Sequence, residues 1–331
     1  MSGLGLGIIG LGVGRRYAEL ARTAGFRYLA VCDVAEKKLN AVAERLEVDW
    51  LGTDYRQLLA LPEVDAVVIA TPDALHQEMA VRAAQSGKHI LCETPLALRR
   101  PSAELIVDAT LEAGVHLMAA HRLRFHPLVQ RFREELTGIG EIGLFEARWV
   151  RPATEAPTDW RLDPKLKRNL AVGEAVDVVD AVRWMMGDLY EITGFTTKRF
   201  FPDWPVGDTV VSAGRFLNKA GLSVLLSVGG EGPRATRLTA RGANGTLVAD
   251  LEDGELTLAT ADGWQLLAAL GPEFDPEGEV LKAFHALLTD GYPNPCNVGE
   301  AANAVVTAIA ISDSAEVNLP ARVRPLEFEA V

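Results

Sequence analysis

The chain has 331 residues, of which 48% are hydrophobic, and this length suggests about two domains with cores of their own. It carries 33 Lys and Arg against 45 Asp and Glu, a net charge of −12, which argues against binding to nucleic acid or to an anionic membrane. No apolar run approaches the roughly 18 residues of a membrane span. The N-terminus lacks the basic leader of a signal peptide, and the three cysteines (Cys32, Cys92 and Cys296) are scattered, as in a reduced cytoplasmic protein.

The first third of the chain alternates short apolar strands with helices. The predicted strands are 4–9, 28–32, 65–70, 89–92 and 115–120, and the predicted helices are 15–24, 35–46, 75–86 and 101–113. Continuously apolar strands separated by helices are typical of a parallel sheet that is covered on both faces. Right-handed crossovers then give a doubly wound domain that binds ligands at the carboxyl ends of its strands.

The pattern changes after about residue 121, where longer strands follow one another. They are predicted at 144–151, 192–200, 208–217, 223–229, 237–241, 246–250, 255–259 and 264–268, with turn signals such as Asn244-Gly245 between them. Helices at 171–186, 278–289 and 299–314 are expected to cover one face of this antiparallel sheet. The predicted fold is therefore a Rossmann domain over residues 1–121 and an α+β domain over residues 122–331, with an open, mainly antiparallel sheet.

A glycine-rich turn between the first strand and the first helix predicts a dinucleotide site. Gly10, Gly12 and Gly14 allow a tight turn that a pyrophosphate can approach, next to the positive end of a helix. Asp33 ends the second strand, where a carboxylate accepts hydrogen bonds from the adenosine ribose and repels a 2′-phosphate, which favours NAD over NADP. The third glycine comes one position earlier than in the GxGxxG pattern, so the loop is one residue tighter. The alternative is a turn in which glycine serves only close packing of helix and sheet.

Several motifs carry a resemblance to a known family. They include ATPDALH at 70–76, GKH at 87–89, CETP at 92–95, RFHP at 124–127 and WRLDP at 160–164, and the order continues through Asp180, Trp184, Gly187, Phe284 and residues 314–316. With these motifs the sequence resembles the Gfo/Idh/MocA oxidoreductases, the relatives of glucose–fructose oxidoreductase and inositol dehydrogenase. The resemblance implies the fold described above and NAD(P)-dependent oxidation or reduction of a sugar or cyclitol carbon. It also implies a homodimer or homotetramer that uses the open sheet.

The resemblance also implies roles for individual residues. The residues implied to bind the cofactor are Gly10, Gly12, Val13, Gly14 and Arg15 around the pyrophosphate, Asp33 at the ribose, Thr71, Pro72 and His76 in the adjacent wall, Glu93, Thr94 and Pro95 in the family's Glu-Lys-Pro position, and Trp160 and Arg161 from the second domain.

The catalytic positions of the family are replaced. Its Lys, Asp and His fall on Thr94, Gly173 and Asp177, and Asp180 alone agrees with the motif. Threonine is no useful base at neutral pH, and an ordinary aspartate, with a pKa of about 3.9, is a weak one. On one continuous helix Gly173 and Asp177 lie one turn apart and face the same way. Thr94 and Asp177 are therefore the candidate catalytic residues.

Other charged residues offer candidates for a substrate site. His121, Arg122 and Arg124 follow the last parallel strand, and Lys165, Lys167 and Arg168 replace family glycines or lie near them. These cations are expected to bind a carboxylate or phosphate of the ligand, with a solvated loop as the alternative. The residues predicted to bind the substrate are Arg124, Lys165 and Asp177.

Some residues have a structural interpretation instead. Asp180 is expected to be structural, either paired with an arginine or capping backbone groups, and Glu174 to be a solvated charge on a helix face. His76 has two interpretations, a residue of the cofactor wall and a partly buried structural histidine. No spacing of His, Cys, Asp and Glu predicts a metal site.

Three functions follow from this sequence. The first is an NAD(P)-dependent oxidoreductase that acts on a sugar, polyol or related hydroxy or keto compound with altered catalytic groups. The second is a dinucleotide-binding regulator or partner protein without turnover, because the cofactor loop is intact while the catalytic positions are not. The third is chemistry without net redox change that uses a bound cofactor transiently.

Overall fold

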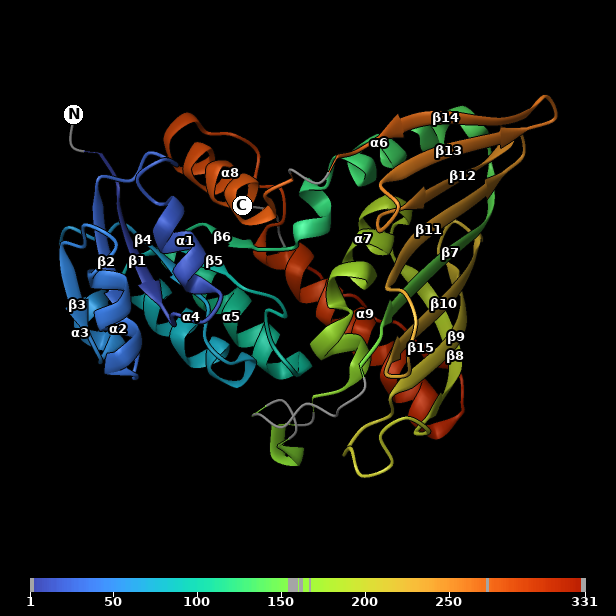
Figure 1. Ribbon diagram of the computed structural model, residues 1–331. Coiled ribbons are helices and arrows are strands. Elements are labelled where there is room, and N and C mark those ends of the chain that lie inside the picture. Colours follow the sequence, from blue (N-terminus) through green and yellow to red (C-terminus); the bar gives the residue numbers. More distant parts are fainter. Residues whose placement is uncertain (1–2, 154–159, 161–162, 167, 272–273, 329–331) are drawn as a thin grey trace. The chain divides into compact units, whose positions relative to one another are not determined.

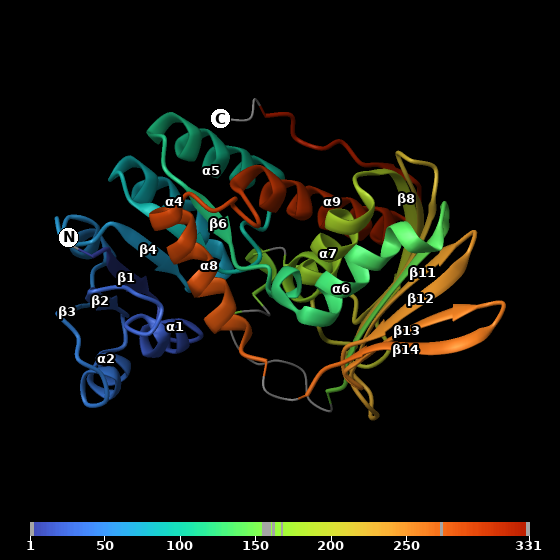
Figure 2. The ribbon, with the colours of Figure 1, turned by 90° about the horizontal axis from the view of Figure 1, so that it is seen from above.

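A computed structural model describes residues 3–153, 160, 163–166, 168–271 and 274–328 (Figures 1 and 2). The chain divides into two compact units, which are described separately. The first unit contains the residues up to Arg122, Asp275–Ala302 and the segment from Glu327, and the second contains Leu123–Phe274 and Asn303–Leu326. This division differs from a single cut at residue 121, because α8 (Pro276–Asp290) packs against α1 (Gly14–Leu20) of the first unit.

The first unit contains a parallel sheet of six strands in the order β3-β2-β1-β4-β5-β6. The strands are β1 (Gly5–Ile9), β2 (Tyr28–Cys32), β3 (Trp50–Gly52), β4 (Ala66–Ile69), β5 (His89–Cys92) and β6 (Leu117–Ala119). Consecutive strands run outward on opposite sides of β1, so the direction of winding reverses between β1 and β4. In doubly wound folds this reversal opens a crevice for a ligand at the carboxyl ends of the strands. The predicted fold class is confirmed.

The helices of this unit connect the strands as expected, with two elements that the sequence pattern missed. The helices are α1, α2 (Glu36–Ala43), α3 (Tyr55–Leu59), the 3₁₀ turn η1 (Asp73–Leu75), α4 (His76–Gln85), α5 (Arg100–Ala113) and α8. The missed elements are β3 and α3, which have three and five residues. Segments this short show no periodicity that distinguishes a strand from a helix.

The second unit contains a nine-stranded sheet in the order β14-β13-β12-β11-β7-β10-β9-β8-β15. The strands are β7 (Ile142–Arg151), β8 (Leu189–Thr197), β9 (Thr209–Phe216), β10 (Gly221–Val228), β11 (Ala235–Gly242), β12 (Gly245–Asp250), β13 (Glu255–Thr260), β14 (Gly263–Ala269) and β15 (Ala321–Arg322). The mainly antiparallel sheet is confirmed, but β7 and β10 pair in parallel. They can do so because α7 (Val176–Met186) and the β8–β9 hairpin intervene between them.

Helices cover one face of this sheet, as Figure 2 shows. They are α6 (Pro127–Glu135), which packs on β12–β14, α7, which packs on β7, and the later part of α9 (Val298–Val317). Thr307 and Ile311 of α9 line one small cavity with Ala147 and Leu222 of the sheet. The expectation that the helix at 278–289 also covers this sheet is wrong, since α8 packs in the first unit, and α6 was missed. Among the described residues, no helix is long and apolar enough to cross a membrane.

Candidate functional site

The glycine loop follows β1 and is closely packed at two of its three glycines. Gly10 has a φ of +94°, and a Cβ there would lie 2.5 Å from the carbonyl oxygen of Ala70. A Cβ on Gly14 would lie 3.0 Å from Ile8 Cγ2 and 3.1 Å from Ala70 Cβ. By contrast, a Cβ on Gly12 would meet nothing within 4 Å. Gly10 and Gly14 thus let β1 and α1 approach β4, while Gly12 leaves its backbone open on the outside of the loop.

The carboxylate of Asp33 is fixed to this loop. Its Oδ2 accepts a hydrogen bond from the backbone N–H of Leu11 at 2.7 Å, and its Oδ1 accepts one from the N–H of Ala35 at 2.9 Å. Lys38 Nζ lies 3.3 Å from Oδ2. The structure therefore brings the predicted ribose acid against the predicted pyrophosphate loop. Sequence reasoning missed the ammonium of Lys38, although its position five residues after Asp33, one turn into the next helix, was visible in the sequence.

Val13 and Arg15 lie at the surface where α1 begins. Val13 is the N-cap residue of α1 and is exposed, and the guanidinium of Arg15 pairs with Glu19 at 3.5 Å along the helix. Val13 lies between Gly12 and Gly14 in the loop, and Arg15 follows Gly14.

His76 joins the loops that follow β4 and β5. Its Nδ1 lies 2.8 Å from the carbonyl oxygen of Pro95, and its Nε2 lies 2.9 Å from that of Thr71. The ring is buried and the Thr94–Pro95 peptide bond is cis. Burial alone would lower the pKa of the imidazole. Cys92, Asp73 and the Pro95 carbonyl raise it by a larger amount, so the pKa is about 10. His76 is thus completely buried under the loop that contains Thr71 and Pro72, and does not itself form an exposed wall.

Glu93 is held by two other elements of the first unit. Its Oε1 accepts hydrogen bonds from the hydroxyl of Tyr17 at 2.7 Å and from the guanidinium of Arg122 at 2.8 Å. Arg122 also pairs with Glu277 of α8 at 3.0 Å. Burial and the neighbouring Glu93 raise the pKa of Tyr17 well above its usual value, so this hydroxyl stays protonated and donates. Tyr17 and Arg122 are separated from Glu93 by 76 and 29 residues, and sequence reasoning did not connect them.

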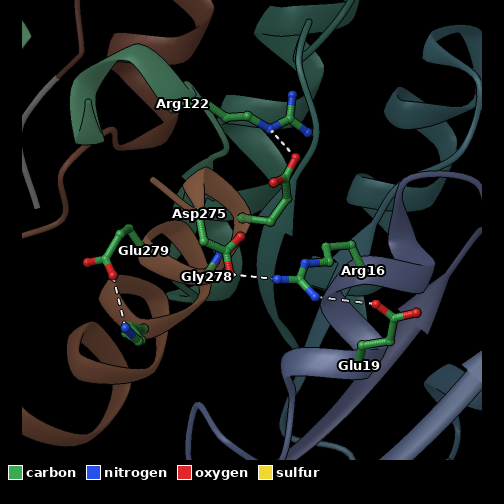
Figure 3. Close-up of polar contacts among 8 residues, drawn as sticks. Arg16, Glu19, Arg122, Asp275, Gly278 and Glu279 are labelled. Atoms are coloured by element: carbon green, nitrogen blue, oxygen red, sulfur yellow. Dashed lines mark hydrogen bonds and ion pairs between the residues drawn. The ribbon is translucent and has the colours of Figure 1, made fainter. Parts of the chain in front are cut away.

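Figure 3 shows how α1 and α8 are connected in this region. Arg16 of α1 pairs with Asp275 at 2.8 Å and with Glu19 at 3.4 Å. Asp275 is the N-cap of α8 and accepts a hydrogen bond from the backbone N–H of Gly278 at 3.2 Å. The helix that follows the glycine loop is therefore anchored to a segment that is distant in sequence.

Thr94 stands between Glu93 and Pro95, both of which are buried, and is itself partly exposed. This is the position of the family's lysine. The Thr94 side chain is thus available at the surface of a loop whose two neighbours are held inside the unit.

In the second unit, the segment before α7 differs from the predicted continuous helix. Residues Leu170–Glu174 form a π-helical turn, the backbone breaks at Ala175, and α7 begins at Val176. Gly173 and Asp177 are therefore not one turn apart on a single α-helix, and Asp177 lies in the first turn of α7. A Cβ on Gly173 would lie 2.5 Å from Arg168 Cγ and 2.6 Å from Arg168 Cζ. The side chain of Arg168 thus fills the space that a larger residue at 173 would need.

The predicted basic loop consists of Lys165, Lys167 and Arg168, and it is not exposed to solvent throughout. Arg168 is buried, donates to Glu174 and to the carbonyl oxygen of Gly173, and has its guanidinium 5.5 Å from the ring centroid of Trp160. The expectation of Glu174 as a solvated charge is therefore wrong. Lys165 is exposed, and the predicted residues Arg161 and Lys167 lie outside the described residues.

Arg124 and Asp180 form a buried ion pair in the second unit. The guanidinium nitrogens Nε and one Nη of Arg124 each lie 2.7 Å from a carboxylate oxygen of Asp180, and the two side chains are 3% and 0% exposed. The predicted structural pairing of Asp180 with an arginine is confirmed. Because this bidentate bond engages the guanidinium, Arg124 is better described as a structural partner than as a substrate-binding residue.

Comparisons with known proteins give the same assignment for both parts of the chain. Residues 4–121 match the GFO_IDH_MocA model, described as an oxidoreductase family with an NAD-binding Rossmann fold, and residues 135–248 match the GFO/IDH/MocA C-terminal domain. The chain belongs to the Gfo/Idh/MocA oxidoreductase family. Residues 4–121 are thus its NAD-binding Rossmann domain, as the glycine loop and Asp33 predicted.

Curated relatives match over part of their length. A D-xylose 1-dehydrogenase (NADP(+)) from Haloferax volcanii is 31% identical over 58% of this chain and 59% of that protein. Levoglucosan dehydrogenase from Pseudarthrobacter phenanthrenivorans is 30% identical over 58% of this chain and 48% of that protein. The matched region thus spans about half to three fifths of these relatives.

Solved structures match over nearly the whole chain. A levoglucosan dehydrogenase in complex with NADH and levoglucosan has a TM-score of 0.87 at 22% identity, and covers 97% of this chain and 99% of that one. An oxidoreductase domain protein from Kribbella flavida has a TM-score of 0.88, also at 22% identity, with 98% of this chain and 100% of that chain covered. At this identity the likeness shows the fold.

Proposed function

We propose that this Gfo/Idh/MocA protein is an NAD(P)-dependent dehydrogenase or reductase that transfers hydride to or from a CH–OH carbon of a sugar, polyol or related hydroxy or keto compound. The observation that carries the proposal is the hydrogen bond between Asp33 and the glycine loop at Leu11. A carboxylate held beside an open loop backbone supports dinucleotide binding, which uses a carboxylate for the ribose and backbone N–H groups for the pyrophosphate. The sugar dehydrogenases among the relatives support the substrate class.

The residues present fit a bound dinucleotide. Gly10, Gly12 and Gly14 would hold the pyrophosphate and Asp33 the adenosine ribose, with Thr71, Pro72 and Thr94 further along the carboxyl edge of the sheet. When bound, the nicotinamide supplies the acceptor or donor of the hydride. NAD is favoured because the carboxylate of Asp33 repels a 2′-phosphate, although the ammonium of Lys38, 3.3 Å away, offsets part of this charge.

The proton of the reacting hydroxyl needs a group other than the family's lysine and histidine. We assign this role to Asp177, in the first turn of α7, and assign to Thr94 a hydrogen bond to the substrate hydroxyl. Arg124 and Arg168 are engaged in buried ion pairs, whereas Lys165 is exposed, and we assign to Lys165 the contact with an anionic group of the substrate.

Absorbance of NADH on mixing the protein with a panel of polyols, sugar acids and keto sugars tests this function. We expect turnover with at least one compound, and a rate lower by about 10²–10⁴ in Asp177→Asn, because general base catalysis contributes that much. Asp253→Asn, in an exposed turn, is the matched control and should turn over normally. An unchanged rate in Asp177→Asn would remove Asp177 from the mechanism.

A second candidate function is a dinucleotide-binding regulator or partner protein without turnover. The observation that favours it is Arg168, whose side chain fills the space beside Gly173 where the family has an aspartate. NADH binding by a folded protein that converts no compound of the panel would support this function over the first.

We also propose a homo-oligomer that uses the sheet face opposite α6 and α7. Trp264 and Leu266 of β14 and Phe195 of β8 are exposed, by 71%, 54% and 49%. Ion pairs between neighbouring strands, such as Glu146–Arg241 and Glu191–Arg215, place both signs of charge on the same sheet. A surface that carries both signs can be complementary to a second copy of itself, as a two-fold interface requires. The three free, buried cysteines support a cytoplasmic location for this assembly.

A further inference from the structure

Two of the groups that His76 contacts are carbonyl oxygens, which can only accept hydrogen bonds, and the side chain of Cys92 also forms a hydrogen bond with the ring. The carbonyl oxygens of Pro95 and Thr71 lie 2.8 Å and 2.9 Å from the two ring nitrogens. A neutral imidazole has one N–H and one bare nitrogen, so one of these contacts would set two lone pairs against each other. Only the imidazolium donates to both carbonyl oxygens at once, so these two contacts favour the charged ring.

The surroundings of the ring also favour the charged form. The titratable groups that act on the ring are Cys92 of β5 and Asp73 of η1, and Asp73 is itself 7% exposed. A carboxylate attracts the charged ring, whereas a thiol does so by its charge only when it is ionised. The carbonyl dipole of Pro95 adds to their effect. A charge in a buried site persists only where such partners compensate for the lost hydration.

The two carbonyls belong to the loops that carry residues of the proposed cofactor site. Thr71 follows β4, and Pro95 follows Thr94 in the loop after β5. We propose that His76 is a charged imidazolium at neutral pH that holds these two loops together and thereby positions Thr94 beside the bound cofactor. The positioning part of this inference rests on the proposed function, whereas the charged state of the ring does not. His76 is accordingly a positioning residue.

NMR of the protein labelled with ¹⁵N in its histidines tests the charged state directly. We expect both ring nitrogens of His76 to be protonated at pH 7.5 and to remain so at pH 9. His89 is an internal control, because its Nδ1 accepts a hydrogen bond from the backbone N–H of His116 at 3.0 Å and its pKa is lowered by burial and by His116. His89 should show one protonated and one bare nitrogen at pH 7.5. The same signature for His76 would overturn the proposal.

Titration with NADH tests the positioning. His76→Gln keeps N–H donors but loses the charge, and we expect it to bind NADH about tenfold or more weakly, since hydrogen bonds from charged groups are the stronger ones. His89→Gln is the matched control and should bind NADH as the wild type does. Equal affinity of His76→Gln and wild type would overturn the positioning role.

The two measurements separate this inference from the proposed function. If the wild type binds no NADH, the proposed function fails and the positioning part fails with it, while a doubly protonated ring still supports the charged clamp. If NADH binds and the ring is neutral, the proposed function stands and this inference is overturned. Where His76→Gln does not fold, the spectrum of the wild type still decides the charged state.

Discussion

At the scale of single residues, substitutions at two glycines of the cofactor loop are expected to affect stability and cofactor binding to different extents. Gly12 has open space where a Cβ would project, whereas Gly10 has a φ of +94° and the Ala70 carbonyl oxygen 2.5 Å from that position. We expect Gly12→Ala to change the free energy of unfolding by no more than about 0.5 kcal/mol. The added methyl group would stand where the pyrophosphate approaches, so the affinity for NADH should fall about tenfold or more.

Calorimetric titration with NADH and thermal unfolding together check this prediction. Gly10→Ala is the contrasting variant, because it should lose stability as well as binding. A Gly12→Ala protein with wild-type affinity would mean that the dinucleotide does not pass over this loop.

The charge on His76 makes stability depend on pH. Its pKa is about 10 in the folded protein, above the ordinary value of 6.5, so folding takes up a proton between these values. The resulting stabilisation is fully present below pH 6.5 and is lost as the pH rises through 10. We expect the difference in free energy of unfolding between wild type and His76→Gln to be largest near pH 6 and to shrink toward pH 10. Urea unfolding at several pH values measures it, and a constant difference would contradict the charged ring.

At the scale of elements, Asp275 at the start of α8 makes both a capping hydrogen bond and an ion pair, and substitutions can measure the two contributions separately. Asp275 caps α8 through the N–H of Gly278 and also pairs with Arg16, at side-chain exposures of 37% and 46%. Loss of an N-cap costs about 1 kcal/mol, whereas exposed ion pairs contribute about 0–1 kcal/mol. We expect Asp275→Ala to destabilise the protein by about 1 kcal/mol, and Arg16→Ala by less than about 0.5 kcal/mol.

Asp275→Asn distinguishes the two contributions, because it keeps the capping oxygen and removes the charge. Chemical denaturation of the three variants is the measurement. If Asp275→Asn loses as much stability as Asp275→Ala, the ion pair rather than the cap holds α8 to α1.

The elements that the sequence predicted best are those whose local hydrophobic pattern determines where they begin and end. The strands Tyr28–Cys32 and His89–Cys92 were predicted to the residue, because each is a short apolar run that ends at a charged residue. The amphipathic α6 was missed, since only Leu128, Val129 and Phe132 are buried in a segment otherwise rich in Arg and Glu.

The remaining features depend on side-chain contacts that the hydrophobic pattern of the sequence does not encode. The π-helical turn at Leu170–Glu174 accompanies the packing of Arg168 against Gly173. In the site, Asp33 and the glycine loop were predicted because they belong to one βαβ motif. The partners of Glu93 were not, because Tyr17 and Arg122 meet it only through the fold.

At the scale of the whole molecule, the exposed face of the nine-stranded sheet is the surface that we propose for association with a second copy of the chain. Exposed apolar side chains gathered on a sheet are typical of interfaces, and Trp264 and Leu266 lie on the same strand, 71% and 54% exposed. We expect the wild type to be a dimer or tetramer and Trp264→Glu to shift it toward the mass of one chain, because a charge buried without a partner opposes association. Light scattering after size exclusion gives the mass. Tyr292→Glu, at an exposed residue of the first unit, is the matched control and should keep the wild-type mass. A monomeric wild type would contradict the proposal that this sheet face forms an interface between copies of the chain.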